Sequence, residues 1–223
     1  MPQYRHEWKH RLNGADLVIL RQRLRQVMMP DIHASDGTYF IRSLYFDDGS
    51  DTALREKLDG VSKREKFRIR YYNFDPSLIH LEKKSKICGL GIKETVTLTP
   101  QQTQAIINRD TDWMKTSSQP LLQELHRKTT GGLRPKTIVD YTREAFVFPP
   151  GNVRVTLDYH IRTGLSCTDF LNTDCITIPV PEDPILLEVK WDNFLPTVIR
   201  DAVQLNNRHA AAFSKYAICR VYD

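Results

Sequence analysis

Charged side chains recur at alternate positions along several short segments of this 223-residue sequence. Arg68 and Arg70 flank Ile69, and Glu188 and Lys190 flank Val189 in the same way. In a β-strand, residues two apart lie on the same face, so each pair places its charges on one face and an apolar residue on the other. The same alternation occurs in Glu7 and Lys9, in Glu82, Lys84 and Lys86, in Tyr141 and Arg143, and in Arg154, Thr156 and Asp158.

These charged faces could bind phosphates. Arginine and lysine side chains donate charge-assisted hydrogen bonds to phosphate oxygens, and rows of them match a linear chain of phosphates. Carboxylates among them serve no purpose in anion binding alone, whereas carboxylate oxygens are ligands of hard divalent cations. The pattern therefore predicts a site for a phosphate chain together with Mn²⁺ or Mg²⁺. The candidate metal ligands are Glu7, Glu82, Asp158 and Glu188.

The elements that must position these residues are mostly strands. Strands are predicted over 4–12, 38–46, 65–73, 78–87, 92–98, 136–148, 153–159 and 185–191, and helices over 14–28, 52–58, 101–108, 120–128, 195–204 and 210–221. This order is typical of an α+β fold and not of βαβ units. If the apolar faces pack outward against the helices, the charged faces point at each other across a closed antiparallel β-barrel of about eight strands, wide enough for one slender ligand. No long linker interrupts the chain, so a single domain over 1–223 is expected.

An ordinary sheet with a solvated charged face would explain any one of these strands. Several strands with the same alternation of charges favour an enclosed site, because inward-facing like charges are costly unless a polyanion lies between them.

His6-Glu7-Trp8-Lys9-His10 matches the zinc protease signature H-E-x-x-H, but that chemistry requires a helix and the charge alternation predicts a strand. The basic run 83–86 has no aromatic platform beside it, so no nucleic-acid partner is expected.

The composition favours anionic partners and a cytoplasmic protein. The chain carries 32 Lys and Arg against 27 Asp and Glu, a net charge of +5, which does not distinguish nucleotide, nucleic acid and membrane surface. No apolar run approaches the roughly 18 residues of a membrane span, and the first residues lack the apolar stretch of a signal peptide. The four cysteines, at 88, 167, 175 and 219, form no C-x-x-C pair and are interpreted as reduced thiols.

Five short motifs add a resemblance to this pattern. They are Tyr45-Phe46-Asp47, K-F-R-I-R-Y-Y over 66–72, Leu81-Glu82-Lys83-Lys84, Leu187-Glu188-Val189-Lys190-Trp191 and Phe213-Ser214-Lys215-Tyr216. Together, and in this order, they resemble the vacuolar transporter chaperone (VTC) domain, the polyphosphate polymerase branch of the triphosphate tunnel metalloenzymes. The resemblance runs from Tyr4 to Tyr222. It implies an eight-stranded tunnel whose basic residues hold a nucleoside triphosphate and the growing polymer, while a glutamate holds Mn²⁺ or Mg²⁺.

The resemblance also implies roles for individual residues. The implied phosphate ligands are Lys9, Arg68, Arg70, Lys84, Arg143, Arg154, Lys190 and Lys215, assisted by Tyr141 and Ser214. The implied metal ligand is Glu188; the charge pattern adds Lys86 to the phosphate contacts and Glu7 to the metal site, with Glu82 and Asp158 as further candidates. The wider superfamily opens with Glu-x-Glu-x-Lys, whereas this chain has Arg5, Glu7 and Lys9. A cation thus replaces one carboxylate, which disfavours a two-metal triphosphatase and favours a polymerase-type site.

The expected function is therefore that of a metal-dependent phosphotransferase. It would transfer the γ-phosphoryl group of ATP, or of another nucleoside triphosphate, onto phosphate or inorganic polyphosphate. Two alternatives remain open: a hydrolase of triphosphate or polyphosphate, and a non-catalytic module that binds polyphosphate or nucleotide. A membrane-protein partner is compatible with this family but has no signature in the sequence.

Overall fold

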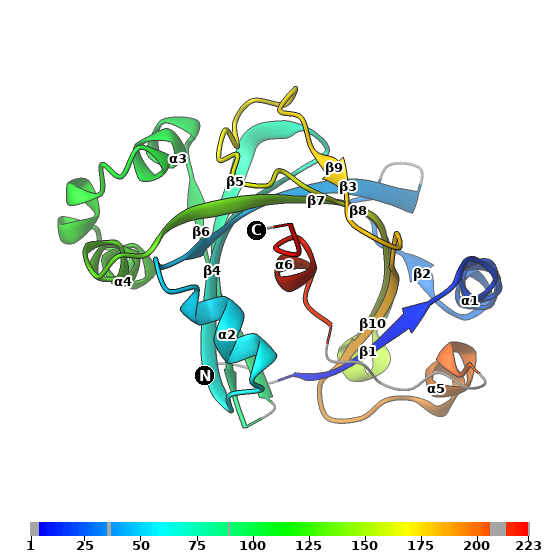
Figure 1. Ribbon diagram of the computed structural model, residues 1–223. Coiled ribbons are helices and arrows are strands. Elements are labelled where there is room, and N and C mark those ends of the chain that lie inside the picture. The colour runs from blue at the N-terminus through cyan, green and yellow to red at the C-terminus, as the bar shows by residue number, and fades with distance from the viewer. Residues whose placement is uncertain (1–4, 35–36, 89, 206–212, 223) are drawn as a thin grey trace. The chain divides into compact units, whose positions relative to one another are not determined.

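The computed structural model describes residues 5–34, 37–88, 90–205 and 213–222 (Figure 1). The chain divides into two compact units. Unit 1 comprises Met1–Phe40, Tyr141–Ile161 and Pro179–Phe213, and unit 2 comprises Ile41–Asp140, Arg162–Ile178 and Ser214–Asp223. Each unit has its own hydrophobic core and is assembled from segments distant in the sequence. The single domain expected over 1–223 stays a prediction.

The strands of unit 1 follow the order β1-β10-β8-β7. Their bounds are β1 His6–Leu12, β7 Arg134–Phe148, β8 Val153–Thr163 and β10 Ile185–Trp191, and the short strands β2 Met29–Pro30 and β9 Ile178–Pro179 pair with β7 and β8. Residues 134–140 of β7, 162–163 of β8 and 178 of β9 are counted with unit 2. β10 is antiparallel to both β1 and β8, and its register places Glu188 between Lys9 and Thr156. The three-residue turn η3 (Pro150–Asn152) leads from β7 into β8.

Two helices cover the apolar face of this sheet. α1 (Gly14–Val27) and α5 (Thr197–Val203) lie beside each other in Figure 1. The core beneath them contains apolar residues that alternate with the charged ones along the strands: Val153, Val155, Leu157, Leu187 and Val189. Asn13 caps α1 as predicted, because its side chain accepts a hydrogen bond from the Asp16 backbone N–H at 2.8 Å. α1 is the longest helix described and has 14 residues; no helix in the described ranges is long and apolar enough to cross a bilayer.

Unit 2 contains the order β3-β4-β5-β6, with antiparallel pairing throughout. The strands are β3 Thr38–Asp47, β4 Lys63–Tyr72, β5 Asp75–Ile87 and β6 Leu90–Leu98, and the helical segments are α2 Thr52–Leu58, α3 Pro100–Ile107, η2 Asp112–Thr116, α4 Pro120–Thr130 and α6 Lys215–Ile218. Tyr45 lies opposite Arg68, and Arg68 lies opposite Glu82. Thr99 caps α3 and Pro100 begins it, as the sequence predicts.

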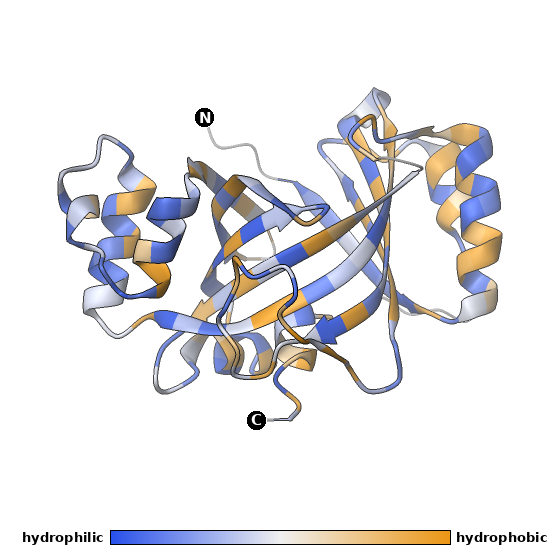
Figure 2. Ribbon diagram, turned by 90° about the horizontal axis from the view of Figure 1, so that it is seen from above, coloured by the Kyte–Doolittle hydropathy of each residue, from blue (hydrophilic) through white to orange (hydrophobic). Residues whose placement is uncertain are grey.

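The apolar face of these strands packs against α3 and α4. Phe67, Ile69 and Leu81 are buried there with Ile106 of α3 and Leu125 of α4. Figure 2 shows the resulting alternation of hydrophilic and hydrophobic residues along the strands. The prediction that the apolar partners of the charged residues pack against helices is thus confirmed in both units.

The structure corrects several expected boundaries. The helix predicted over 195–204 begins only at Thr197, because Pro196 is extended. Within the range predicted as a helix over 210–221, residues 210–212 lie outside the described residues, 213–214 and 219–221 are not helical, and only α6 is helical. The predicted α+β class with flanking helices is confirmed, with a large antiparallel sheet. The hydrogen-bonded order of the main strands is β1-β10-β8-β7-β3-β4-β5-β6, and in the part of the chain that the structure describes no pairing joins its two ends. A barrel closed by hydrogen bonds is therefore not confirmed.

Candidate functional site

A group of alternating charges occupies one face of β1 and β10 in unit 1. The antiparallel register places Lys9 opposite Glu188 and Glu7 opposite Lys190, so each cation has carboxylates as neighbours. The Lys9 Nζ lies 2.9 Å from Glu7 Oε1 and 3.6 Å from Glu188 Oε2, and Lys190 Nζ pairs with the other oxygen of Glu188. Two carboxylates therefore share one ammonium group, on the face opposite the core.

Arg143 of β7 is fixed on the charged face of unit 1 by Asp158 of β8. Its Nε and its terminal nitrogen donate to the two carboxylate oxygens at 2.5 and 2.7 Å, and Asp158 is fully buried. Burial opposes the positive charge of Arg143, but the carboxylate outweighs it and raises the arginine pKa well above its usual value. The Tyr141 ring centroid lies 5.4 Å from the guanidinium. Asp158 thus orients Arg143, and its own role as a metal ligand stays a prediction.

Arg154 and Thr156 continue this face along β8. Arg154 pairs with Asp31 at 2.7 Å and donates to the Tyr39 hydroxyl. Thr156 lies directly opposite Glu188 and is 4% exposed, yet its Oγ1 has no hydrogen-bond partner among the described residues. A buried hydroxyl without a partner is costly. It is therefore a group that a bound ligand could satisfy.

The carboxylates of unit 1 match only part of what a bound cation requires. Within the described ranges no group of three or more His, Cys, Asp or Glu side chains could hold a metal. Mg²⁺, however, is commonly held by one or two carboxylates, with phosphate and water oxygens completing its ligands. Glu7 and Glu188 supply two carboxylates that already enclose the positive charge of Lys9. The donor set thus fits a hard cation shared with phosphates and not one held by protein alone.

A second group of charges surrounds Glu82 in unit 2. This carboxylate is 2% exposed and accepts from Arg68 at 2.7 Å and from Lys93 at 3.0 Å, while Arg70 lies at 3.7 Å. Burial would raise the pKa of Glu82, but these three cations lower it far below its usual range. Ser43 accepts from Arg70 Nε at 2.9 Å. Glu82 is thus ionised and neutralises part of the positive charge of Arg68, Arg70 and Lys93.

Tyr45 adds an ionisable hydroxyl to the group around Glu82. Its oxygen accepts from Arg68 at 3.0 Å. Burial disfavours the phenolate, yet the charges of Arg68, Arg70 and Lys215 outweigh burial and lower the Tyr45 pKa from 10.0 to about 8. A phenol that ionises this readily reports a strongly positive surrounding.

Three lysines form a row across β4, β5 and β6. Lys66 lies directly opposite Lys84, and Lys84 lies directly opposite Lys93. Like charges at opposed positions destabilise a sheet, and the Glu82 carboxylate, 3.0 Å from Lys93 Nζ, supplies a counter-charge at one end of the row. Lys86 lies two residues farther along the same face of β5. We name Lys66, Lys84 and Lys93 the lysine row.

The segment around α6 joins the lysine row through side-chain contacts. Lys66 Nζ donates to Ser214 Oγ at 3.2 Å, and Ser214 in turn caps α6. The Tyr216 hydroxyl donates to Asp47 at 2.6 Å, and its ring stacks on Tyr45 at 5.1 Å. The motif Tyr45-Phe46-Asp47 and the motif that ends in Ser214-Lys215-Tyr216 are therefore in contact in unit 2. This contact places Ser214 and Lys215 beside the charged residues of the strands.

The predicted site residues fall into one group in each unit. Unit 1 contains Glu7, Lys9, Tyr141, Arg143, Arg154, Asp158, Glu188 and Lys190, and unit 2 contains Arg68, Arg70, Glu82, Lys84, Lys86, Ser214 and Lys215. Their roles as phosphate and metal ligands stay predictions. Sequence reasoning missed Tyr45, Lys66, Lys93 and Thr156 as site residues. Lys93 could have been found from the tight hairpin after β5, whose register sets it opposite Lys84.

Comparison with known families identifies the chain. The model of the VTC domain matches residues 4–222. The chain belongs to the VTC domain family. This confirms the family predicted from the sequence, and it supports a function connected with polyphosphate or nucleotides and, in general terms, with phosphoryl transfer. None of the curated proteins matches this VTC-domain chain.

Solved structures are similar to this VTC-domain protein at low sequence identity. One is the crystal structure of a "putative adenylate cyclase" from Bacillus halodurans, with a TM-score of 0.54 and 12% identity over 84% of this chain and 80% of that chain. Another is the PH1819 protein of Pyrococcus horikoshii OT3, with a TM-score of 0.43 and 13% identity over 90% and 84% of the two chains. The first similarity supports the mixed α+β fold.

Proposed function

We propose that this VTC-domain protein is a polyphosphate polymerase that transfers the γ-phosphoryl group of ATP onto phosphate or a growing polyphosphate chain. The observation that carries the proposal is the lysine row beside Arg68 and Arg70. Five cations lie on one face of three strands, at spacings that a string of phosphates can follow. The same face includes the carboxylate Glu82, which keeps the cations in place when no anion is bound.

In this proposal the reaction needs no protein nucleophile. The terminal oxygen of the acceptor phosphate attacks the γ-phosphorus in line, and the nucleoside diphosphate leaves. The basic residues align the phosphates and stabilise the charge on the transferring group. Lys84, Lys86 and Lys215 serve this purpose in unit 2, and Lys9, Arg143, Arg154 and Lys190 in unit 1, with Tyr141 and Ser214 assisting.

The proposed metal site consists of Glu188 and Glu7. A bound Mn²⁺ or Mg²⁺ would neutralise phosphate oxygens at these carboxylates. Lys9 pairs with Glu7 and Lys190 pairs with Glu188, and these ion pairs hold the carboxylates in place until then. The closed barrel, the single domain and a cytoplasmic location belong to the same proposal.

The test is incubation with γ-labelled ATP and Mn²⁺. Long, acid-labile labelled polymer is the expected product. Labelled free phosphate without polymer would instead indicate a hydrolase, and saturable binding without turnover would indicate a binding module.

A matched pair of variants links the result to the lysine row. Lys84→Ala removes the central lysine of the row, whereas Lys83→Ala removes its neighbour on the opposite face, which pairs with Glu65, Glu94 and Glu124. Polymer formation should fall at least about tenfold in the Lys84→Ala variant, which is the effect expected from the loss of one charge-assisted contact. It should stay within about twofold of the unmodified protein in the Lys83→Ala variant. Equal losses in both would contradict the assignment.

A further inference from the structure

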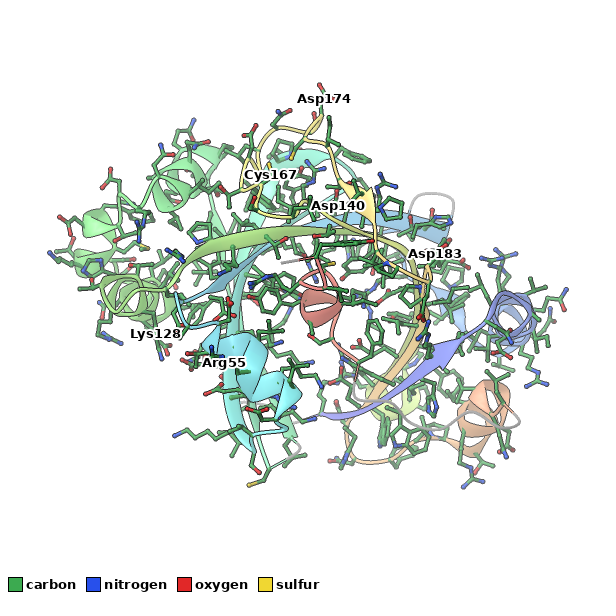
Figure 3. The ribbon with its side chains drawn as sticks, in the orientation of Figure 1. Arg55, Lys128, Asp140, Cys167, Asp174 and Asp183 are labelled. Atoms are coloured by element: carbon green, nitrogen blue, oxygen red, sulfur yellow. The ribbon has the colours of Figure 1, made fainter. Side chains whose placement is uncertain are left out.

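Two thiols meet on the loop that follows β8 in unit 2. The Sγ atoms of Cys167 and Cys175 are 3.0 Å apart, and Figure 3 labels Cys167 on this loop, with Asp174 at its outer tip. A disulfide bond is about 2.05 Å long, so a movement of about 1 Å separates the observed contact from a covalent bond. The sequence had indicated four separate reduced thiols.

The loop that carries these thiols is fixed on both sides. The Arg42 guanidinium, 2% exposed and held by Asp140 at 2.8 and 3.0 Å, donates to the carbonyl oxygens of Asn172 at 2.6 Å and Cys175 at 3.3 Å. On the other side, the Gly164 N–H donates to Ile138 O at 2.8 Å. A β-carbon at Gly164 would approach the Ile138 Cβ to 2.9 Å, so only glycine allows this contact. The thiols are therefore held together by the surrounding fold.

The core anchors the middle of the same loop. Phe170 lies between the two cysteines in the sequence and is fully buried against Tyr71, with ring centroids 4.8 Å apart. Cys167 and Cys175 pack against the same hydrophobic cluster. Closing the loop between them thus leaves its buried contacts in place.

We propose that Cys167 and Cys175 form a reversible disulfide that closes this loop, and that the site reacts with disulfide oxidants of the glutathione class. One cysteine thiolate attacks the sulfur–sulfur bond of glutathione disulfide, which releases one glutathione thiol and leaves a mixed disulfide on the protein. The second cysteine displaces the second glutathione. The two protein thiols lose two electrons and two protons, and glutathione disulfide is reduced to two thiols.

The environment of Cys175 bears on which thiol attacks first. Burial, together with the hydrogen bond to Cys167, raises the pKa of the Cys175 thiol to about 12. Only the thiolate attacks a disulfide, so Cys175 is a poor first nucleophile at neutral pH.

The experiment uses the full chain in glutathione buffers of increasing oxidation, followed by alkylation of free thiols and intact mass measurement. Formation of the disulfide should remove about 2 Da, protect Cys167 and Cys175 from alkylation and raise the melting temperature by about 5–10 °C, as expected for closing a short loop. Dithiothreitol should reverse all three changes. Cys88 is exposed and should instead take up one glutathione, about 305 Da, which shows that the oxidant has acted.

Three variants distinguish the pair from unrelated thiols. Cys88→Ser should lose the glutathione adduct and keep the loss of about 2 Da. Cys167→Ser and Cys175→Ser should each abolish that loss and the rise in melting temperature. The proposal is overturned if Cys88 is modified while Cys167 and Cys175 stay reduced, or if these two cysteines each retain a glutathione.

Discussion

Replacing Glu82 by Gln removes the carboxylate that neutralises Arg68, Arg70 and Lys93. The side chains of Glu82 and Arg70 are 3% and 4% exposed, so Arg70 loses its counter-ion in a buried place. Removing one partner of a buried pair costs about 3–5 kcal/mol. Arg68 and Lys93 are 21% and 57% exposed and can regain water, which favours the lower end of this range. A loss of about 3 kcal/mol corresponds to a fall in melting temperature of about 6–12 °C for a chain of this length.

Tripolyphosphate should reverse much of the Glu82→Gln defect. Its oxygens would replace the missing carboxylate, and ligand binding at a hundredfold excess over the dissociation constant stabilises a protein by about 2.7 kcal/mol. The assay is thermal unfolding with and without tripolyphosphate at constant ionic strength. Glu94→Gln is the matched control, because Glu94 is an exposed carboxylate on β6 whose side chain pairs with Lys83 on the opposite face. It should melt within about 1–2 °C of the unmodified protein, as is usual for surface substitutions.

Two results would refute this reasoning about Glu82. The variant could melt at the same temperature as the unmodified protein, which would mean that the cations need no internal counter-ion. Alternatively, tripolyphosphate and monophosphate could stabilise it equally, which would indicate general screening of charge and no site for a chain of phosphates.

Three further perturbations test the same groups. Glu188→Gln should abolish metal-dependent turnover while far-UV circular dichroism stays unchanged, because a neutral amide binds hard cations poorly; full activity at low metal would contradict the assignment. Arg70→Ala should weaken triphosphate binding by about 2–3 kcal/mol, measured by calorimetry. Ile69→Ala should instead lower the free energy of unfolding by about 2–5 kcal/mol and leave the affinity unchanged, because Ile69 is fully buried. The opposite result would mean that the two faces of β4 are assigned the wrong way round. The fold lowers the pKa of Tyr45 from 10.0 to about 8, so the free energy of unfolding without ligand should rise between pH 8 and pH 10. Over the same range the affinity for triphosphate should fall, because the phenolate repels the anion. Tyr45→Phe should remove both trends.

The division of the strands into two faces could be predicted from the sequence because it is a local property. Ile69 between Arg68 and Arg70 fixes which side of β4 faces the core, wherever the strand lies. The caps of α1 and α3 are equally local, since each depends on residues within one turn. For this reason the charged faces and the starts of α1 and α3 agreed with the structure.

Contacts between distant segments could not be predicted in this way. No local signal connects Arg154 with Asp31, or Tyr216 with Asp47, because these contacts depend on how strands and loops are paired. Barrel closure is a property of the whole sheet and has no local signature either. The short distance between Cys167 and Cys175 likewise arises from a loop held by Arg42.

The alternation along β5 also bears on how such a protein can change during evolution. Leu81 belongs to the core and Glu82 to the charged face, so a single register encodes both folding and ligand contacts. Deleting one residue before Leu81 would turn every following side chain of the strand to the other face, which would bury Lys84 and Lys86 and expose Leu81 at once. Changes in length should therefore be confined to connections such as the loop around Phe170, while the strands can vary only by substitution.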